Sequence, residues 1–294
     1  MSAGVWKALA GLIGALLVAV LALDQWQARQ GETSLLGFSL LAPAPAGSSQ
    51  GGVSPTEPRP MQRPQPPAPP PDGGLSRLAV IVDNLGSRRD VFDLLKDVGR
   101  PVSVAVLPEL PLSKWIAGEA ARAGMEVLLD LPMEPYRYPE MDPGPGALML
   151  AMAPEATARL LVKHLAALPA AVGVTNHMGS RMTEDRARMR AVLEQFRARR
   201  LLFVDAVTSN LSVAYDEARG LGLRAGRRQV LIDAGGGEEA LRARWEEAGR
   251  LAAGRGEAIV LAHGHPLTIR LLKEYVPRWE AARVRMVPVS HVVR

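Results

Sequence analysis

The stretch LAVIVDN (residues 78–84) decides the fold, because a short apolar run ends there directly in two polar residues. Valine and isoleucine favour strands, and a run that is apolar at consecutive positions is typical of a strand buried on both faces. The same design returns along the chain at residues 102–106, 125–129, 171–175, 201–204, 230–232, 258–262 and 284–289. This repetition predicts a series of short strands.

Helical patterns separate these runs. Leu161, Leu165 and Leu168 follow Pro154 with the spacing of one helix face, and proline is well tolerated in the first turn of a helix. Strands that alternate with helices indicate βα units and a largely parallel sheet. We therefore expect residues 77–294 to form a distorted (β/α) barrel of about seven strands.

Polar residues that follow the runs are expected at one rim of this barrel, where strands end and catalytic loops begin. A single aspartate in such a place often only caps the next helix. Here six residues of catalytic type occupy equivalent places: Asp83, Asp130, His177, Asp205, Asp233 and His265. The sequence therefore predicts a functional site at the rim.

Three rim histidines differ in their surroundings. His263 and His265 are two residues apart, so in an extended chain both rings project to the same side, although His263 can instead bond the loop backbone. His177 stands before Gly179, which permits a tight turn, and this favours a ligand or proton carrier over a core residue. His164 lies in a helical pattern, and we expect no functional role for it.

The stretch at residues 130–148 is a long loop without periodicity, rich in proline and glycine. Loops of this length in compact domains are usually functional. Tyr136 and Tyr138 suit the wall of a saccharide-binding cleft, and the alternative is a merely long connection.

The first 76 residues differ from the rest of the chain. Residues 8–23 carry no charge and are flanked by Trp6 and Trp26, so residues 1–30 are expected to be a signal anchor, with a cleaved signal peptide or a buried helix as alternatives. Residues 31–76 contain a proline-rich stretch and are expected to be a disordered linker. We expect the barrel at the outer side of the inner membrane, in the periplasm or cell envelope, or secreted there after cleavage.

Composition excludes some functions. The formal charge of +5 comes from arginines scattered among acids, without the aromatic interleaving of a nucleic-acid surface, so no nucleic-acid partner is expected. The chain has no cysteine, which leaves His, Asp, Glu and Asn as the residues able to hold a metal.

Several motifs together resemble the divergent polysaccharide deacetylase family, a branch of the NodB-homology carbohydrate esterases. They are VDNLG (82–86), LPMEP (131–135), PGPGAL (143–148), NHMGSRMTEDR (176–186), VDAVTS (204–209), GHP (264–266) and VPVS (287–290). The resemblance implies a (β/α) barrel with a divalent metal at the carboxyl ends of the strands. It also implies removal of acetyl groups from a polysaccharide.

The resemblance also implies roles for individual residues. Asp83 would be the base and His265 the acid, with Asp205 grouped beside them. The metal ligands would be Asn84, Asp130, Glu134 and His177, and the residues around the substrate would be Asn176, Arg181, Asp233, His263 and Tyr136.

Two of these ligand positions depart from the family pattern, which has Asp at position 84 and His at position 130, whereas this chain has Asn84 and Asp130. The formal ligand charge is unchanged, but an oxygen-rich shell favours harder divalent ions over zinc. Burial of Asp130 and Glu134 is costly unless a cation, or the neighbours His177 and Arg181, offset it.

Three functions follow from these observations. The first is a metal-dependent deacetylase acting on acetylated polysaccharide of the cell envelope. The second is a catalytically weakened barrel that binds glycan or an envelope partner without hydrolysis. The third is a glycosidase that uses Asp83 and Asp205, which requires a suitable separation of the two carboxyl groups.

Overall fold

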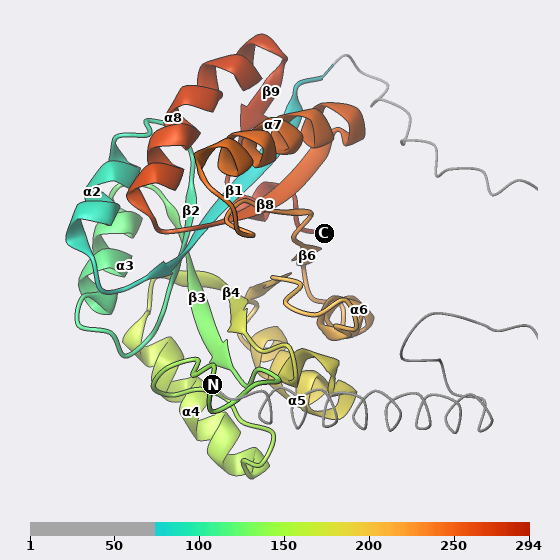
Figure 1. The fold of residues 1–294 in the computed structure, drawn as a ribbon. Coiled ribbons are helices and arrows are strands. Elements are labelled where there is room, and N and C mark those ends of the chain that lie inside the picture. Colours follow the sequence, from blue (N-terminus) through green and yellow to red (C-terminus); the bar gives the residue numbers. More distant parts are fainter. Residues whose placement is uncertain (1–73) are drawn as a thin grey trace, which may run out of the picture. The chain divides into compact units, whose positions relative to one another are not determined.

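The computed structural model describes residues 74–294, and Figure 1 shows a curled sheet with helices packed around its outer side. Nine strands form the sheet in this range: β1 (Ser76–Leu85), β2 (Ser103–Val106), β3 (Glu126–Met133), β4 (Ala171–Met178), β5 (Leu202–Asp205), β6 (Ala225–Arg227), β7 (Val230–Leu231), β8 (Glu257–His263) and β9 (Val284–Met286). The expected anchor (1–30) and nearly all of the expected linker (31–76) lie outside the described residues. Within residues 74–294, no helix is both long and apolar enough to span a bilayer.

The strand order is β6-β5-β4-β3-β2-β1-β8-β7, and β9 pairs with β1 off this path. All of the strand pairs are parallel, as predicted. The expected number of about seven strands is too low, because the three residues of β6 contain no apolar run that would reveal a strand.

The two edge strands, β6 and β7, belong to one continuous segment at residues 225–231. At its middle, the Arg228 N–H donates to the Asp205 carbonyl (3.0 Å) and the Gln229 N–H donates to the Ile259 carbonyl (2.9 Å). The segment therefore borders β5 at its start and β8 at its end. The sheet is therefore a curled, open barrel, and this single segment spans its opening.

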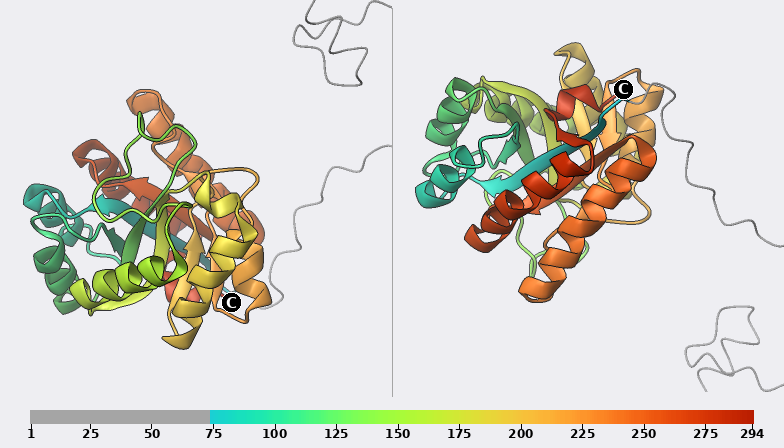
Figure 2. Two further views of the ribbon diagram at one scale, coloured as in Figure 1. Left: turned by 90° about the horizontal axis from the view of Figure 1, so that it is seen from below. Right: turned by 90° about the horizontal axis from the view of Figure 1, so that it is seen from above.

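The helices connect successive strands and cover the outer side of the sheet (Figure 2). They are α2 (Arg89–Lys96), α3 (Ser113–Arg122), α4 (Pro154–Ala167), α5 (Arg186–Ala198), α6 (Ala214–Gly220), α7 (Glu238–Arg255) and α8 (Pro266–Ala281), with short 3₁₀ turns η1 (Met182–Glu184) and η2 (Val289–His291). Pro154 opens α4, as predicted.

Alternation along each strand divides the core into two clusters. In β1, Leu78, Val80 and Val82 belong to the large cluster shared with the helices. Ala79 and Ile81 belong to a smaller cluster inside the curl of the sheet. Because side chains alternate with a period of two, the next inward position is Asp83.

The chain's last residues complete the interior. Val287, Val289, Val292 and Val293 all belong to the inner cluster. The Val289 N–H donates to the Ser103 hydroxyl (3.0 Å), which fixes this segment to β2. The members of both clusters in the described part of the chain lie within one compact unit, residues 62–294.

Candidate functional site at the barrel mouth

Four ionisable side chains meet at the carboxyl ends of the strands, and we call them the mouth cluster: Asp83 on β1, Asp130 on β3, His177 on β4 and His263 on β8. Each lies two residues beyond an inward-facing position of its own strand, so strand periodicity directs all four to the inside of the barrel. Three of the four were predicted as catalytic or metal-binding residues, and His263 was predicted in a supporting role.

Asp83 and His263 form the most direct contact of the cluster. The two residues are in register on neighbouring strands, and Asp83 Oδ1 lies 2.6 Å from His263 Nδ1. The carboxylate is 6% exposed and the imidazole 40% exposed. This hydrogen bond raises the pKa of His263 to about 9. The pair holds the ring in place and leaves Nε2 available to a ligand.

Asp130 is fully buried beside this pair. Its Oδ2 accepts a hydrogen bond from the Asn84 N–H (3.0 Å) and lies 3.9 Å from His177 Nδ1. Burial, and then the nearby Asp83 charge, raises the pKa of Asp130 well above its ordinary value. Burial lowers the pKa of His177. Desolvation thus favours the neutral forms of both groups.

Asn84 has a left-handed backbone conformation (φ 59°), which asparagine adopts more readily than most residues. Its Oδ1 is buried, as is Asp130 Oδ1, and neither atom has a hydrogen-bond partner among the described residues. Such unpaired oxygens are costly inside a protein.

Glu134 does not join Asp130. One of its carboxylate oxygens accepts from Arg181 (2.8 Å) and the other from the Leu150 N–H (2.6 Å), so each oxygen already has a hydrogen-bond partner. Throughout residues 74–294, no three His, Asp or Glu side chains are placed to hold a metal ion together. Of the predicted ligands, Asp130, Glu134 and His177 are therefore not gathered as one group, whereas Asn84 lies next to Asp130.

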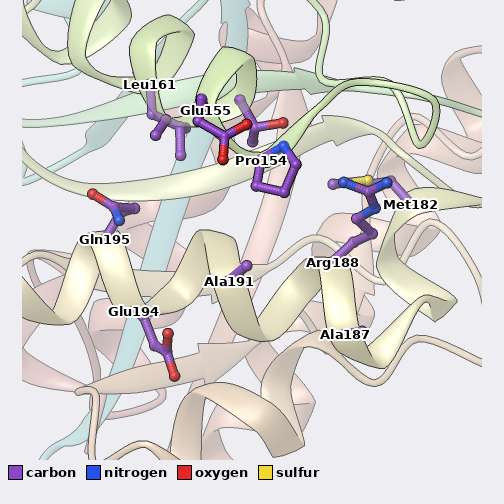
Figure 3. A pocket seen from close by; sticks show the side chains of 11 residues that line it. Pro154, Glu155, Leu161, Met182, Ala187, Arg188, Ala191, Glu194 and Gln195 are labelled. Carbon is purple, nitrogen blue, oxygen red and sulfur yellow. The ribbon is translucent and has the colours of Figure 1, made fainter.

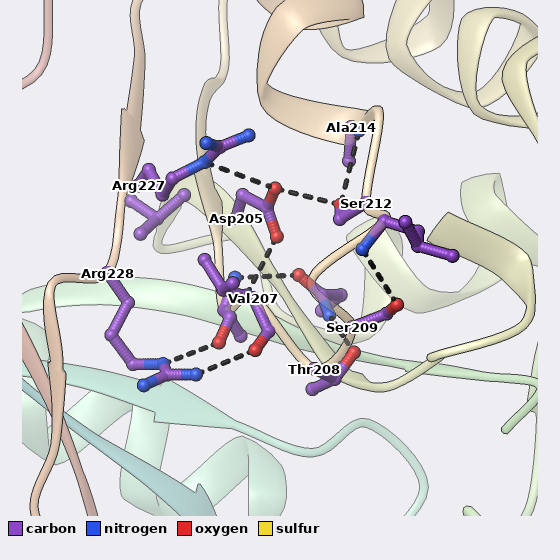
Figure 4. A network of polar contacts seen from close by, with 12 residues as sticks. Asp205, Val207, Thr208, Ser209, Ser212, Ala214, Arg227 and Arg228 are labelled. Atoms are coloured by element: carbon purple, nitrogen blue, oxygen red, sulfur yellow. Dashed lines mark hydrogen bonds and ion pairs between the residues drawn. The ribbon is translucent and has the colours of Figure 1, made fainter. Parts of the chain in front are cut away.

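Asp205 organises a loop rather than facing the mouth cluster (Figure 4). Its neighbours Val204 and Ala206 belong to the inner cluster, so alternation points Asp205 outward. Its carboxylate accepts from the Val207 N–H (2.8 Å) and the Ser212 hydroxyl (2.9 Å). This position does not support a glycosidase carboxylate pair with Asp83.

Arg228 is a mouth residue that the sequence analysis did not single out. Its guanidinium donates to the carbonyls of Ala206 (2.5 Å) and Val207 (2.7 Å). Val207 has a positive φ of 50°, a strained conformation for a β-branched residue, and Arg228 holds the loop in that shape (Figure 4). Arg228 lies next to Gln229 on the segment that spans the sheet opening. The sequence does not reveal this position, because it depends on how β5 and β8 are brought together by the fold.

Asn176 and Asp233 brace neighbouring strand ends. Asn176 Oδ1 accepts from the Ala206 N–H (2.9 Å), linking the ends of β4 and β5. Asp233 accepts from the His263 N–H (2.6 Å) and from the Thr268 hydroxyl (2.6 Å), linking β8 to α8. Both residues therefore hold the strand ends beside the mouth cluster, and their predicted role around the substrate stays a prediction.

A cavity of about 360 Å³ opens beside His263. His265 also lines it, but this residue caps α8, with Nδ1 accepting from the Leu267 N–H (3.3 Å). The predicted acid is thus exposed, and His263 holds the more central position. Tyr136 lies in the long loop between β3 and α4 and is 54% exposed.

A second hollow, of about 520 Å³, lies between α4 and α5 (Figure 3). Its walls include Leu161, Met182 and Ala191, and none of the predicted site residues lines it. The mouth, not this groove, is the candidate site.

Comparison with known proteins agrees with this architecture. Residues 80–293 match the family described as divergent polysaccharide deacetylase. The uncharacterized protein YibQ of Escherichia coli K12 is 32% identical over 200 residues, which cover 68% of this chain and 62% of YibQ, less than two thirds of that relative. An uncharacterized protein of Haemophilus influenzae Rd is 28% identical over 204 residues, covering 67% of this chain and 70% of the relative.

One solved structure shows the same fold. The crystal structure of an uncharacterized protein from Agrobacterium tumefaciens C58 aligns with a TM-score of 0.71 at 24% identity, and the alignment covers 76% of this chain and 92% of that one. The arrangement of strands and helices is thus shared with a protein of known structure.

Proposed function

Because the chain belongs to the divergent polysaccharide deacetylase family, we propose that its barrel binds an acetylated polysaccharide at the mouth and hydrolyses it weakly or not at all. The observation that carries this proposal is the commitment of Glu134 to Arg181 and the Leu150 N–H. Only Asp130 and His177 then remain from the expected His, Asp and Glu ligands. Two such ligands alone would hold a divalent metal weakly, and this disfavours the metal-dependent chemistry of the family.

The mouth retains groups suited to binding an acetylated sugar. The His263 ring, fixed by Asp83 and protonated at neutral pH, offers Nε2–H as a charge-assisted donor to an acetyl carbonyl. The adjoining cavity of about 360 Å³ includes the apolar side chain of Leu267, against which a methyl group can pack. Tyr136 and Tyr138 are about half exposed and offer ring faces to a sugar.

The proposed cellular location rests on the expected anchor. An anchored barrel exported across the inner membrane would meet acetylated polysaccharide of the cell envelope. This placement is part of the proposal, as is the absence of a nucleic-acid partner.

A second candidate is the active, metal-dependent deacetylase. It is favoured by the two buried oxygens without partners, Asn84 Oδ1 and Asp130 Oδ1, because a bound cation would satisfy them. The two candidates make opposite predictions about metal content and about turnover.

The test measures binding and turnover together. Purified protein is titrated with acetylated chito-oligosaccharide by calorimetry, acetate release is followed with added Zn²⁺, Mn²⁺ or Mg²⁺, and bound metal is quantified. We expect glycan binding with little bound metal and little acetate. The double variant Asn84→Asp with Asp130→His restores the family's ligand types, and we expect it to bind zinc at least about tenfold more tightly.

Two controls separate the outcomes. Asp83→Asn should weaken glycan binding without changing metal content, since Asp83 orients His263. Stoichiometric metal and steady acetate release by the unaltered chain would establish the second candidate and overturn the first. No glycan binding by any variant would overturn both.

A further inference from the structure

The two ends of the barrel carry opposite charge. The loops that enter the strands lie at one end, here called the amino-terminal face, and they contain Arg100, Arg199, Arg200, Arg224 and Arg283 but only one acid, Asp97. The loops that leave the strands contain four arginines, one of which is Arg228 at the mouth, against seven acids, which are Glu109, Glu134, Glu140, Asp142, Glu184, Asp185 and Asp233. The fold therefore places most of the loop arginines at one end of the barrel and most of the loop acids at the other, because parallel strands bring all the entering loops to the same end.

The positive charge of the amino-terminal face is only partly neutralised. Arg77 (2.5 Å) and Arg294 (2.6 Å) both contact the single carboxylate of Glu257. A cavity of about 420 Å³ on this side is lined by Arg219, Arg227 and Arg294, with Glu257 as the one acid in its lining. Arg100 is paired with Glu280 (2.6 Å), so the guanidinium groups left in surplus include Arg199 and Arg200, and such groups suit phosphate oxygens.

The chain enters the domain at this same face. β1 begins at Ser76, and Arg77 at its start donates to the carbonyl of His291 near the C-terminus (2.8 Å). Figure 2, right, shows the C-terminus next to the start of β1. The expected anchor at residues 1–30 precedes β1 in the chain, and β1 starts on the basic side of the barrel.

We infer that the amino-terminal face docks on a bilayer surface that contains anionic phospholipid, with the mouth directed away from the membrane. Charge complementarity and the entry point of the chain both favour this occupant. The inference concerns the face opposite the mouth and holds whether or not the mouth hydrolyses its ligand. It explains why the arginines are gathered at the end that contains none of the mouth cluster.

Residues 74–294 suit the test because they lie within one compact unit and include the whole of the family match at residues 80–293. The fragment is sedimented with vesicles of phosphatidylcholine alone or with 30% phosphatidylglycerol, at about 50 mM and about 500 mM salt. We expect binding only to the anionic vesicles and release at high salt, since screening shortens the reach of exposed charges.

A pair of charge-reversal variants tests the face itself. Arg199→Glu with Arg200→Glu should weaken binding at least about tenfold, since one basic residue near an anionic surface contributes about fivefold. Neither side chain forms an ion pair within residues 74–294. The matched control, Arg88→Glu with Arg137→Glu on the mouth side, changes the charge equally and should bind like the unaltered fragment.

Three results would overturn the inference. They are equal loss in both variant pairs, salt-independent binding to neutral vesicles, and binding to duplex DNA without binding to anionic vesicles. Circular dichroism and thermal melting of each variant confirm that a loss of binding does not come from a loss of fold.

Discussion

Replacing Asp83 with asparagine should release His263 from the charge that holds its proton. The donor and acceptor atoms lie 2.6 Å apart, and the bond raises the pKa of His263 to about 9 from an ordinary 6.5. In Asp83→Asn we expect this pKa to fall by about 2 units, because the replacement side chain has no charge. The change is measured by NMR titration of the ring protons, with His263→Gln to assign the signal among the five histidines.

The same change affects stability in a pH-dependent way. A raised pKa in the folded state means that the proton binds more tightly there, so the stabilisation is complete below pH 6.5 and is lost as pH rises through about 9. The ring is 40% exposed, and after allowance for solvent screening we expect about 1 kcal/mol. Urea unfolding at pH 6 and pH 10 should show this difference in the unaltered protein and not in Asp83→Asn.

Asp233→Asn is the matched control. Asp233 also lies near His263 but accepts its backbone N–H, so its contribution to the ring's pKa is smaller. A His263 that titrates near 6.5 in the unaltered protein, or that responds equally to both substitutions, would refute the reasoning.

Three further predictions concern the scaffold. Glu134→Gln should lower the free energy of unfolding by about 1–3 kcal/mol in urea, because a buried carboxylate loses its charge-assisted hydrogen bonds to the half-exposed Arg181 and to the Leu150 N–H; an unchanged value would contradict the assigned contacts. Gly226→Val should cost about 1–3 kcal/mol, since a Cβ there would lie 2.4 Å from Ile259 Cδ1, whereas Gly220→Ala, with open space around it, should have little effect on Tm. Burial lowers the pKa of His164, so the folded state resists its protonation and stability should decline as pH falls below 6.5, with a smaller decline in His164→Gln; parallel pH profiles would show that His164 is not responsible.

The sequence was sufficient to predict the parallel αβ architecture and the gathering of Asp83, Asp130 and His177 at one end of the barrel. Short apolar runs such as residues 78–82 correspond to strands because burial on both faces demands continuous apolar sequence. The three-residue β6 escaped detection because its pairing with β5 depends on tertiary context rather than on its own composition.

Within the site, strand alternation predicts the direction of side chains on the strands but not of those beyond the strand ends. Counting by twos from Ile81 reaches Asp83, and the same count from Val204 passes over Asp205, so the outward direction of Asp205 was within reach of the sequence. The direction of Glu134 could not be predicted, because Glu134 lies just beyond the end of β3. There its N–H donates to the Leu148 carbonyl and its carboxylate accepts from Arg181. The central role of His263 over His265 likewise depends on its register with Asp83.

The pairing of Asp83 with His263 joins residues 180 positions apart. During synthesis, β1 therefore emerges long before its neighbours β8 and β9, and its unpaired edge stays open to wrong partners until they arrive. Contacts of such high sequence separation also slow the search for the native topology. The mouth cluster thus forms only once the last quarter of the polypeptide has been made, so a chain that ends before β8 has the first strand but lacks the partner of Asp83.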